Sequence, residues 1–465
     1  MISAPLEQRV DPQEHDPASG KRIWRVGTLT YNPHTLAWLF VWLLGGDFAL
    51  AVRDRAIPPI IQILFKRFEA SDFLTALIFA SIPAALSVII NPIVAYNSDR
   101  LRTRWGRRIP FMFASVPFIV TSTVGLAFSP QLGAALDALL GSRSPGLNSC
   151  CLIVLAVCWT IFEIGCVTTF AILGALMNDV VPQAVMGRFF GLFRAVGLVA
   201  GIAFFLNVLG EAKAHYAWIF LGVGAIYTAA FTVMCWKVKE GQPPPVIDHV
   251  ATRPGIFTAV RTYFRDGFGN PYYLWYFAVM MLGGLSGAPV NIFSLYFSES
   301  YGISDGTYGK WIACSYGVSL LLSYPLGIAA DRFHPLRLSI AGLAIYAVVM
   351  ACAGFLVHDA TTFSIAFILH NVLSGSLATA WASLPQRLLP RARFAEIGSA
   401  CGIVGALAAI FITPFFGRIL DVMHHEYRYT FFMTAVMSAF ALGAFVVLHT
   451  RFMKLGGPRH YTAPE

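Results

Sequence analysis

Charged residues are scarce in this sequence. Asp, Glu, Lys and Arg make up only 12% of the 465 residues, whereas hydrophobic residues make up 57%. A soluble globular protein carries about 25% charged residues. The composition therefore excludes an ordinary soluble domain and predicts an all-α membrane protein that crosses the bilayer many times.

Catalytic, nucleotide-binding and metal-binding patterns are also lacking. There is no glycine-rich nucleotide loop, no paired metal-ligand motif and no soluble segment long enough for a catalytic core. The eight cysteines are scattered, mostly inside apolar runs, and we interpret them as small packing residues. We therefore expect no enzyme, no cofactor and no metal. The formal net charge of +9 does not indicate a nucleic-acid partner, because the basic residues lie in short loops between apolar runs.

Long apolar runs are what the sequence has in abundance. A helix needs about 20 apolar residues to cross the hydrocarbon core of a bilayer. Twelve runs predict such helices, at residues 34–52, 72–97, 110–128, 149–178, 188–210, 215–236, 271–298, 308–330, 338–357, 361–384, 395–420 and 428–450. The expected units are an N-terminal tail (1–33), a six-helix bundle (34–236), a linker (237–270), a second six-helix bundle (271–452) and a C-terminal tail (453–465).

The stretch Asn97–Pro110 concentrates positive charge between two apolar runs. It holds five arginines and one acid, and a weaker copy occupies the equivalent place in the second half. Positive charge gathers on the cytoplasmic side of a membrane, so we expect these loops and both termini to be cytoplasmic, in an inner or plasma membrane. Arg53 and Arg55, expected in the loop after the first span, are the exception. The equivalent loops indicate parallel repeats with a substrate site between them.

The same stretch resembles a loop of the major facilitator superfamily. Ser98-Asp99-Arg100, followed by Arg104-Trp105-Gly106-Arg107-Arg108-Ile109-Pro110, is similar to the loop of glycoside–pentoside–hexuronide:cation symporters and sucrose transporters. Asp179-Val-Val-Pro182 with Gly187-Arg188 resembles the superfamily's acid–proline–arginine pattern. The resemblance implies twelve helices in two bundles, transport by alternating access and a cytoplasmic gate in which Arg188 pairs with Asp179 or Asp99. The expected gate residues are Asp99, Arg100, Arg107, Arg108, Asp179, Arg188, Asp331 and Arg332.

Two departures from the related families bear on the coupling ion and the substrate. Asn91 stands where melibiose-type symporters carry an aspartate, and a neutral amide supplies little of the charge that holds a sodium ion. Residues 187–210 contain no proline, whereas drug antiporters carry a glycine–proline signature there. We therefore favour a proton as the coupling cation and do not expect drug efflux.

Acids and bases inside membrane spans are costly to bury and are functional candidates by default. Asp47, Glu163 and Arg194 lie in the first half, with Trp159 one helical turn from Glu163. A carboxylate accepts hydrogen bonds from sugar hydroxyls, an arginine donates to them, and a tryptophan stacks on a pyranose ring. The context of Asp47 also resembles the sugar-contacting aspartate of melibiose-type symporters. We expect Glu163 or Asp47 to carry the coupling proton; alternatively, a Glu163–Arg194 pair merely locks two helices.

The second half offers mainly neutral polar groups at mid-span. Asn291, His370 and Asn371 are the expected substrate contacts there, although His370 could instead form a hydrogen bond between helices. Glu299 and Asp305 are expected at the outer rim. Charge in one half and neutral groups in the other suit a neutral polyol.

The sequence therefore favours a monomeric symporter that couples a proton to a glycoside or small oligosaccharide. Two alternatives stay open: a carrier for another small solute or an amphiphile such as a lysolipid, and a non-transporting sensor or assembly factor. Related lysolipid carriers have a lysine in the eleventh helix, whereas residues 394–420 contain none. The charges inside the spans weigh against a sensor.

Overall fold

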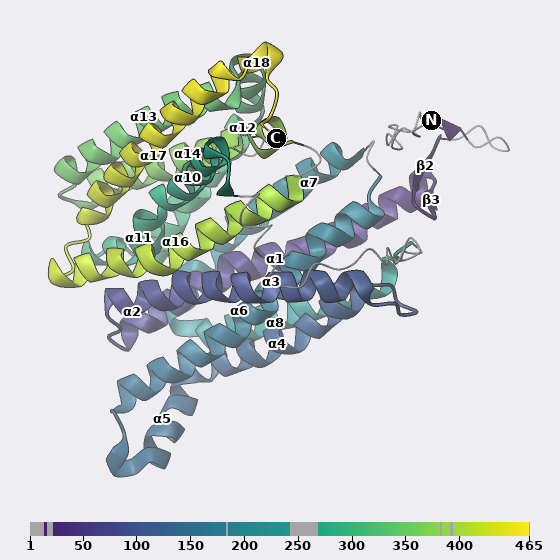
Figure 1. Ribbon diagram of the computed structural model, residues 1–465. Coiled ribbons are helices and arrows are strands. Elements are labelled where there is room, and N and C mark those ends of the chain that lie inside the picture. Colours follow the sequence, from purple (N-terminus) through teal and green to yellow (C-terminus); the bar gives the residue numbers. More distant parts are fainter. Residues whose placement is uncertain are drawn as a thin grey trace.

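The computed structural model describes residues 14–15, 22–182, 185–241, 268–381, 384–390 and 394–464. Two helical bundles make up the molecule (Figure 1). Within the described residues, eleven helices are long and apolar enough to cross a membrane, and α12 occupies the position of the remaining expected span. The expected all-α membrane architecture is thus confirmed.

The first bundle is built from the helices of the N-terminal half. These are α1 (Pro33–Arg67), α2 (Asp72–Ala76), the π-helical η1 (Leu77–Ser81), α3 (Ile82–Arg100), α4 (Ile109–Ala127), α6 (Leu147–Val180), α7 (Met186–Asn207), the 3-10 turn η4 (Leu209–Glu211) and α8 (Ala212–Lys237). The segments α2, η1 and α3 follow one another without a break and form one span. That span and the four that follow it lie within a few residues of the expected runs.

The second bundle repeats this pattern. It contains α10 (Pro271–Ser286), α11 (Ala288–Ser300), α12 (Asp305–Phe333), α13 (Pro335–Leu356), α14 (Ala360–Trp381), the short α15 (Leu384–Leu388), α16 (Phe394–Val422) and α17 (Tyr429–Lys454), followed by α18 (Gly457–His460). α10 and α11 share one span that is interrupted at Gly287. Most of the linker expected at 237–270 lies outside the described residues, which end at 241 and resume at 268.

The first expected span, 34–52, is too short, because α1 continues to Arg67. Asn32 starts the helix with a capping box in which its side chain and that of Thr35 each accept a hydrogen bond from the other's backbone N–H. Pro58 and Pro59 lie inside the helix, where each removes a backbone hydrogen bond. The packing of α1 against α7 and α8 nevertheless keeps it continuous. The basic residues expected in a loop after the first span are therefore part of α1.

Some smaller elements were not expected from the sequence. A three-stranded antiparallel sheet, β1 (Glu14–His15), β2 (Arg22–Val26) and β3 (Leu29–Tyr31), precedes α1. Helix α5 (Ser129–Leu140) packs along α6, and the 3-10 turn η2 (Gly141–Arg143) follows it. In Figure 1 α5 stands out from the first bundle.

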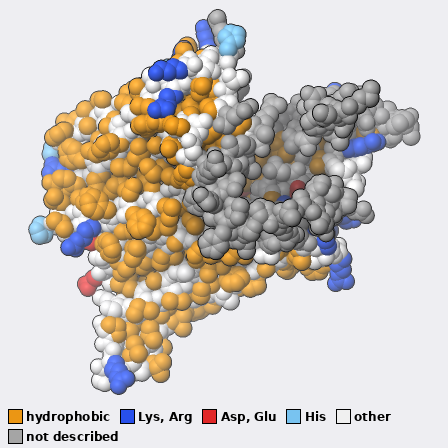
Figure 2. Space-filling view, in the orientation of Figure 1, with side chains coloured by type: hydrophobic (Ala, Val, Ile, Leu, Met, Phe, Trp, Pro, Cys, Tyr) orange, Lys and Arg blue, Asp and Glu red, His pale blue; other side chains and the backbone are white. Residues whose placement is uncertain are grey.

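The two bundles meet at one end of the molecule and separate at the other. We call the end that carries the Asn97–Pro110 loop the basic end, and the opposite one the far end. At the far end, α16 packs against α2, η1 and α3, while α12 packs against α7 and η4. Toward the basic end the bundles diverge (Figure 1), and many of the residues on the face seen in Figure 2 there are not described. The space between the bundles is therefore closed at the far end.

Glycines allow the close approach at the far end. A Cβ atom on Gly417 of α16 would lie 2.3 Å from the carbonyl oxygen of Asp72, and one on Gly309 of α12 would lie 2.2 Å from that of Phe205. Both neighbours are backbone atoms of the other bundle, which cannot rotate aside. Small residues at such crossings let helix backbones touch in a membrane.

We expect Gly417→Ala to open the far end, because the added methyl group forces α16 away from α2. The matched control is Gly405→Ala in the same helix, where no atom lies within 4 Å of the added Cβ. Spin labels at the exposed Leu139 and Phe355, in a cysteine-free background, report the distance between the bundles by pulsed electron spin resonance. A longer distance is expected for Gly417→Ala alone, and equal distances in both variants would contradict this packing argument.

Candidate functional site

A buried arginine lies in the middle of α1. Arg53 has 0% exposure, and its Nε and Nη2 atoms donate to Oδ1 of Asp54 at 2.9 and 2.7 Å. Its guanidinium also lies 5.4–5.8 Å from three aromatic rings, those of Phe162, Phe170 and Tyr227. Nη1 has no hydrogen-bond partner within the described residues. One edge of the guanidinium is therefore left without a hydrogen-bond acceptor among the described residues.

Two carboxyl groups, those of Asp54 and Glu163, act on this arginine, and a third, that of Asp47, lies near Asp54. Glu163 of α6 lies within electrostatic reach of both Arg53 and Asp54, and Asp54 lies within reach of Asp47. Asp47 and Asp54 are seven residues apart and so share a face of α1. Asp47 is buried, and its Oδ2 atom has no hydrogen-bond partner in the described part of the chain. We call Asp47, Arg53, Asp54 and Glu163 the α1–α6 charge cluster.

A hydroxyl network fixes the aromatic wall beside Arg53. The Tyr227 hydroxyl lies 2.9 Å from Oγ1 of Thr169 and 3.3 Å from Oγ of Ser115, and all three side chains are buried. These residues come from α8, α6 and α4, so the network ties three helices around the arginine. The position of the ring is therefore set by packing within the first bundle.

The substrate-stacking role expected for Trp159 is not supported by its position. Its indole is only 3% exposed, and Nε1 donates to the carbonyl oxygen of Ile78 in η1 at 2.9 Å. The rings of Phe79 and Phe162 stack against it at centroid distances of 4.9 and 5.3 Å. No free face is left for a sugar ring. Trp159 instead joins α6 to the π-helical turn.

Arg194 is not paired with Glu163. It is exposed on α7, and its Nη2 donates to Oγ1 of Thr379 in α14 at 3.0 Å. A second contact between the bundles was not expected from the sequence. Arg55 of α1 donates to the hydroxyl of Tyr316 in α12, and its guanidinium lies 4.8 Å from the centre of that ring. Two arginines of the first bundle thus contact hydroxyl groups of the second.

In the second bundle His370 forms a hydrogen bond between helices. It is completely buried, with Nδ1 2.8 Å from the Tyr346 hydroxyl and Nε2 2.9 Å from Oδ1 of Asn291. Its ring is therefore fixed between α11 and α13, and Asn291 remains exposed. The amide nitrogen of Asn371 donates to the Phe367 carbonyl within its own helix at 3.0 Å.

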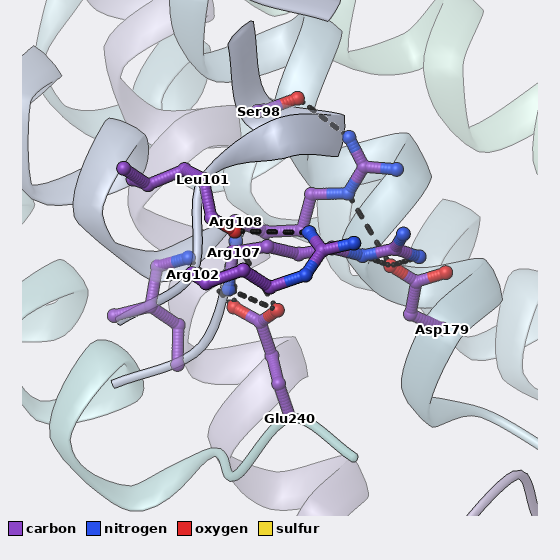
Figure 3. Close-up of polar contacts among 8 residues, drawn as sticks. Ser98, Leu101, Arg102, Arg107, Arg108, Asp179 and Glu240 are labelled. Carbon is purple, nitrogen blue, oxygen red and sulfur yellow. Dashed lines mark hydrogen bonds and ion pairs between the residues drawn. The ribbon is translucent and has the colours of Figure 1, made fainter. Parts of the chain in front are cut away.

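At the basic end a polar cluster joins the α3–α4 loop to α6 and the start of the linker (Figure 3). Oδ2 of Asp179 accepts from Arg107 at 2.7 Å and from Arg108 at 3.3 Å, and Arg108 also donates to Ser98 at 2.6 Å. Glu240 accepts the backbone N–H groups at the start of α4, those of Arg107, Arg108 and Ile109, at 2.7–3.1 Å. A carboxylate is favourable at a helix N-terminus.

Among the described side chains, Arg107 and Arg108 are the ion-pair partners of Asp179. The other expected gate contacts concern side chains outside those described: Asp99, Arg100, Arg188 and Asp331. Arg332 is exposed, with its guanidinium 5.5 Å from the ring of Phe333.

Ion pairs join the two bundles at the far end. Lys66 and Lys213 of the first bundle contact Glu299 of the second at 3.0 and 2.6 Å, and Lys213 also contacts Asp305 at 3.3 Å. Beside them, the hydroxyl of Tyr296 in α11 donates to the carbonyl oxygen of Gln62 at 3.0 Å. Glu299 and Asp305 thus lie at the rim of the closed end.

Comparison with known proteins agrees with this architecture. The family described as "MFS/sugar transport protein" matches residues 68–389, which is more than half of the chain. A bacterial homologue of the human lysosomal transporter Spinster, in an inward-facing and unoccupied conformation, has a TM-score of 0.67 at 15% identity and covers 94% of this chain and 100% of its own.

Two further solved structures share the fold. A D-xylose–proton symporter has a TM-score of 0.62 at 15% identity, covering 88% of this chain and 96% of its own. A nucleoside transporter has a TM-score of 0.63 at 12% identity, covering 88% and 99%. The chain therefore belongs to the MFS/sugar transport protein family and is a multi-pass membrane transporter rather than an enzyme.

Proposed function

We propose that the protein is a symporter that couples one proton to the movement of a glycoside or small oligosaccharide. The observation that carries this proposal is the α1–α6 charge cluster, whose member Asp54 precedes Arg55, the residue that contacts Tyr316 of the other bundle. Three carboxylates and one guanidinium leave an excess of two negative charges when all four groups are ionised. Binding a proton reduces that excess.

The cluster can couple proton binding to closure of the site. Excess charge is costly in a medium of low dielectric constant, because water no longer solvates it. While water reaches the space between the bundles, the ionised carboxylates are tolerated. When the bundles close and water leaves, protonation of Glu163 or Asp47 lowers the free-energy cost of the excess negative charge. Proton binding and closure therefore favour each other.

Polar groups for a neutral sugar lie between the bundles. Arg55 and Arg194 are donors, the hydroxyls of Tyr316 and Thr379 are donors and acceptors, and the Asn291 amide is exposed. The two arginine–hydroxyl contacts already cross between the bundles. Sugar hydroxyl groups can replace them one for one without adding net charge.

The closed far end defines one state of an alternating-access cycle. Breaking the contacts of Glu299 with the two lysines opens the far end, while the bundles approach each other at the basic end. With the arginine-rich loop on the cytoplasmic side, the observed conformation opens inward. The direct test is counterflow of labelled disaccharides in proteoliposomes, with and without a pH gradient. Absence of counterflow for every sugar tested would refute the substrate class.

We expect Glu163→Gln to abolish uphill accumulation, because an amide cannot take up and release the coupling proton. Downhill counterflow is expected to persist, since the variant mimics the protonated carboxyl. Glu211→Gln, in the exposed far-end turn, is the control and retains both activities. Uphill uptake under an imposed pH gradient tests whether Glu163 carries the coupling proton. Full accumulation by Glu163→Gln would show that it does not.

A second variant tests sugar recognition. Tyr316→Phe keeps the ring beside Arg55 but removes the hydroxyl group that accepts its hydrogen bond. A hydrogen bond between two neutral hydroxyl groups contributes about 0.5–1.5 kcal/mol, so losing the bond between Tyr316 and the sugar is expected to raise the half-saturating sugar concentration in counterflow about two- to tenfold. Tyr301→Phe, just beyond α11 at the far end, serves as the control. If Tyr316→Phe had the same half-saturating sugar concentration as the wild type, the Tyr316 hydroxyl would not contact the sugar.

A further inference from the structure

A second polar group joins the bundles at the far end, apart from the lysine pairs. Asp72 of the first bundle and Asp421 and His425 of the second each offer one ligand atom, and these atoms all lie within 4.8 Å of one another. Nδ1 of His425 is 2.7 Å from Oδ2 of Asp72 and 4.0 Å from Oδ1 of Asp421. Ligands around a tetrahedral zinc ion lie about 3.3–3.6 Å apart, given bond lengths of about 2.0–2.2 Å. Small side-chain rotations are enough to reach this geometry.

The donor set suits a divalent transition metal ion. Two carboxylates and a neutral imidazole carry two negative charges, which a doubly charged cation neutralises. Imidazole favours zinc over magnesium or calcium, which prefer oxygen ligands alone. Zn²⁺ binds ionised carboxylates and neutral imidazole, so its binding releases to water any proton that these groups carry.

The surroundings of these residues allow an ion to enter. A cavity of about 1000 Å³ is lined by all three donors together with Lys66, Glu69, Arg418 and Tyr427. The side chain of Asp72 is 2% exposed and that of His425 is 55% exposed, so the site has a buried floor and an open side. Lys66 is engaged by Glu299, and Arg418 is exposed.

The carboxylates are also oriented by other contacts. Asp421 accepts the backbone N–H groups of Asp72 and Phe73 at 2.9 and 3.0 Å, and Tyr427 donates to Oδ1 of Asp72 at 3.2 Å. Contacts of this kind hold metal ligands in position. Each carboxylate oxygen has two lone pairs, so both acids keep acceptor capacity for a metal ion.

We propose that Asp72, Asp421 and His425 form a Zn²⁺ site that locks the two bundles together at the far end. The donors come from both bundles, so the complete site exists only while this end is closed. A bound ion therefore stabilises that state and slows the transport cycle. Zinc acts here as an inhibitor bound outside the substrate site, which is independent of the sugar specificity proposed above.

The test uses the full-length protein in detergent, without an affinity tag, titrated with zinc chloride by calorimetry. One saturable Zn²⁺ site is expected, weakened at least tenfold by His425→Asn. His424→Asn is the matched control, because His424 is the exposed neighbouring residue and both histidines have φ near +60°, a conformation that asparagine tolerates. Its affinity is expected to equal that of the wild type.

A second readout follows the lock itself. With spin labels at Leu139 and Phe355, saturating Zn²⁺ is expected to shift the distribution of label-to-label distances toward the short distance of the closed far end. This shift is expected in the wild type and in His424→Asn, but not in His425→Asn. Neither readout needs a transported solute, so a failure of the proposed sugar specificity leaves both unaffected. Equal Zn²⁺ affinity in the two histidine variants, or no saturable binding, overturns the proposal.

Discussion

A charged arginine buried in the middle of a membrane helix is the constraint on which the first bundle depends. Moving such a charge out of water costs several kcal/mol even after relaxation, so Arg53 requires compensation where it lies. Asp54 supplies two hydrogen bonds, and aromatic rings from α6 and α8 surround the guanidinium. α1, α6 and α8 must therefore stay packed together around this group. The carboxyl groups of Glu163 and Asp47 exceed what one arginine needs, and this excess is the basis of the proton coupling proposed above.

The two ends of the molecule use charge differently. At the far end Lys66 and Lys213 reach acids of the opposite bundle, so these pairs must break for that end to open. At the basic end Asp179 and Glu240 hold the α3–α4 loop, and both belong to the first half or to the beginning of the linker. Ion pairs within one bundle hold its own helices together. Ion pairs between the bundles instead stabilise the conformation in which the far end is closed.

The helices were largely predictable, and the contacts among them were not. Apolar length located the spans within a few residues, with α1 as the main exception, because a hydropathy argument ends a helix at Arg53-Asp54-Arg55. Asp47, Glu163 and Arg194 stood out as charges in apolar runs. Trp159 faces neighbouring aromatic rings, and Arg194 reaches Thr379 instead of Glu163. Helix rotation decides such partners, and the period of one helix does not reveal which neighbour it faces.

The sequence by itself determined the class of protein, the number of spans and the presence of ionisable groups inside them. These properties follow from transfer free energies, which add up along the chain residue by residue. Only the tertiary structure decided that Arg53 is buried and that Asp72 meets Asp421 and His425, about 350 residues later in the sequence. Contacts of that kind depend on how the two bundles pack against each other, and no local property of either segment encodes the packing of the other.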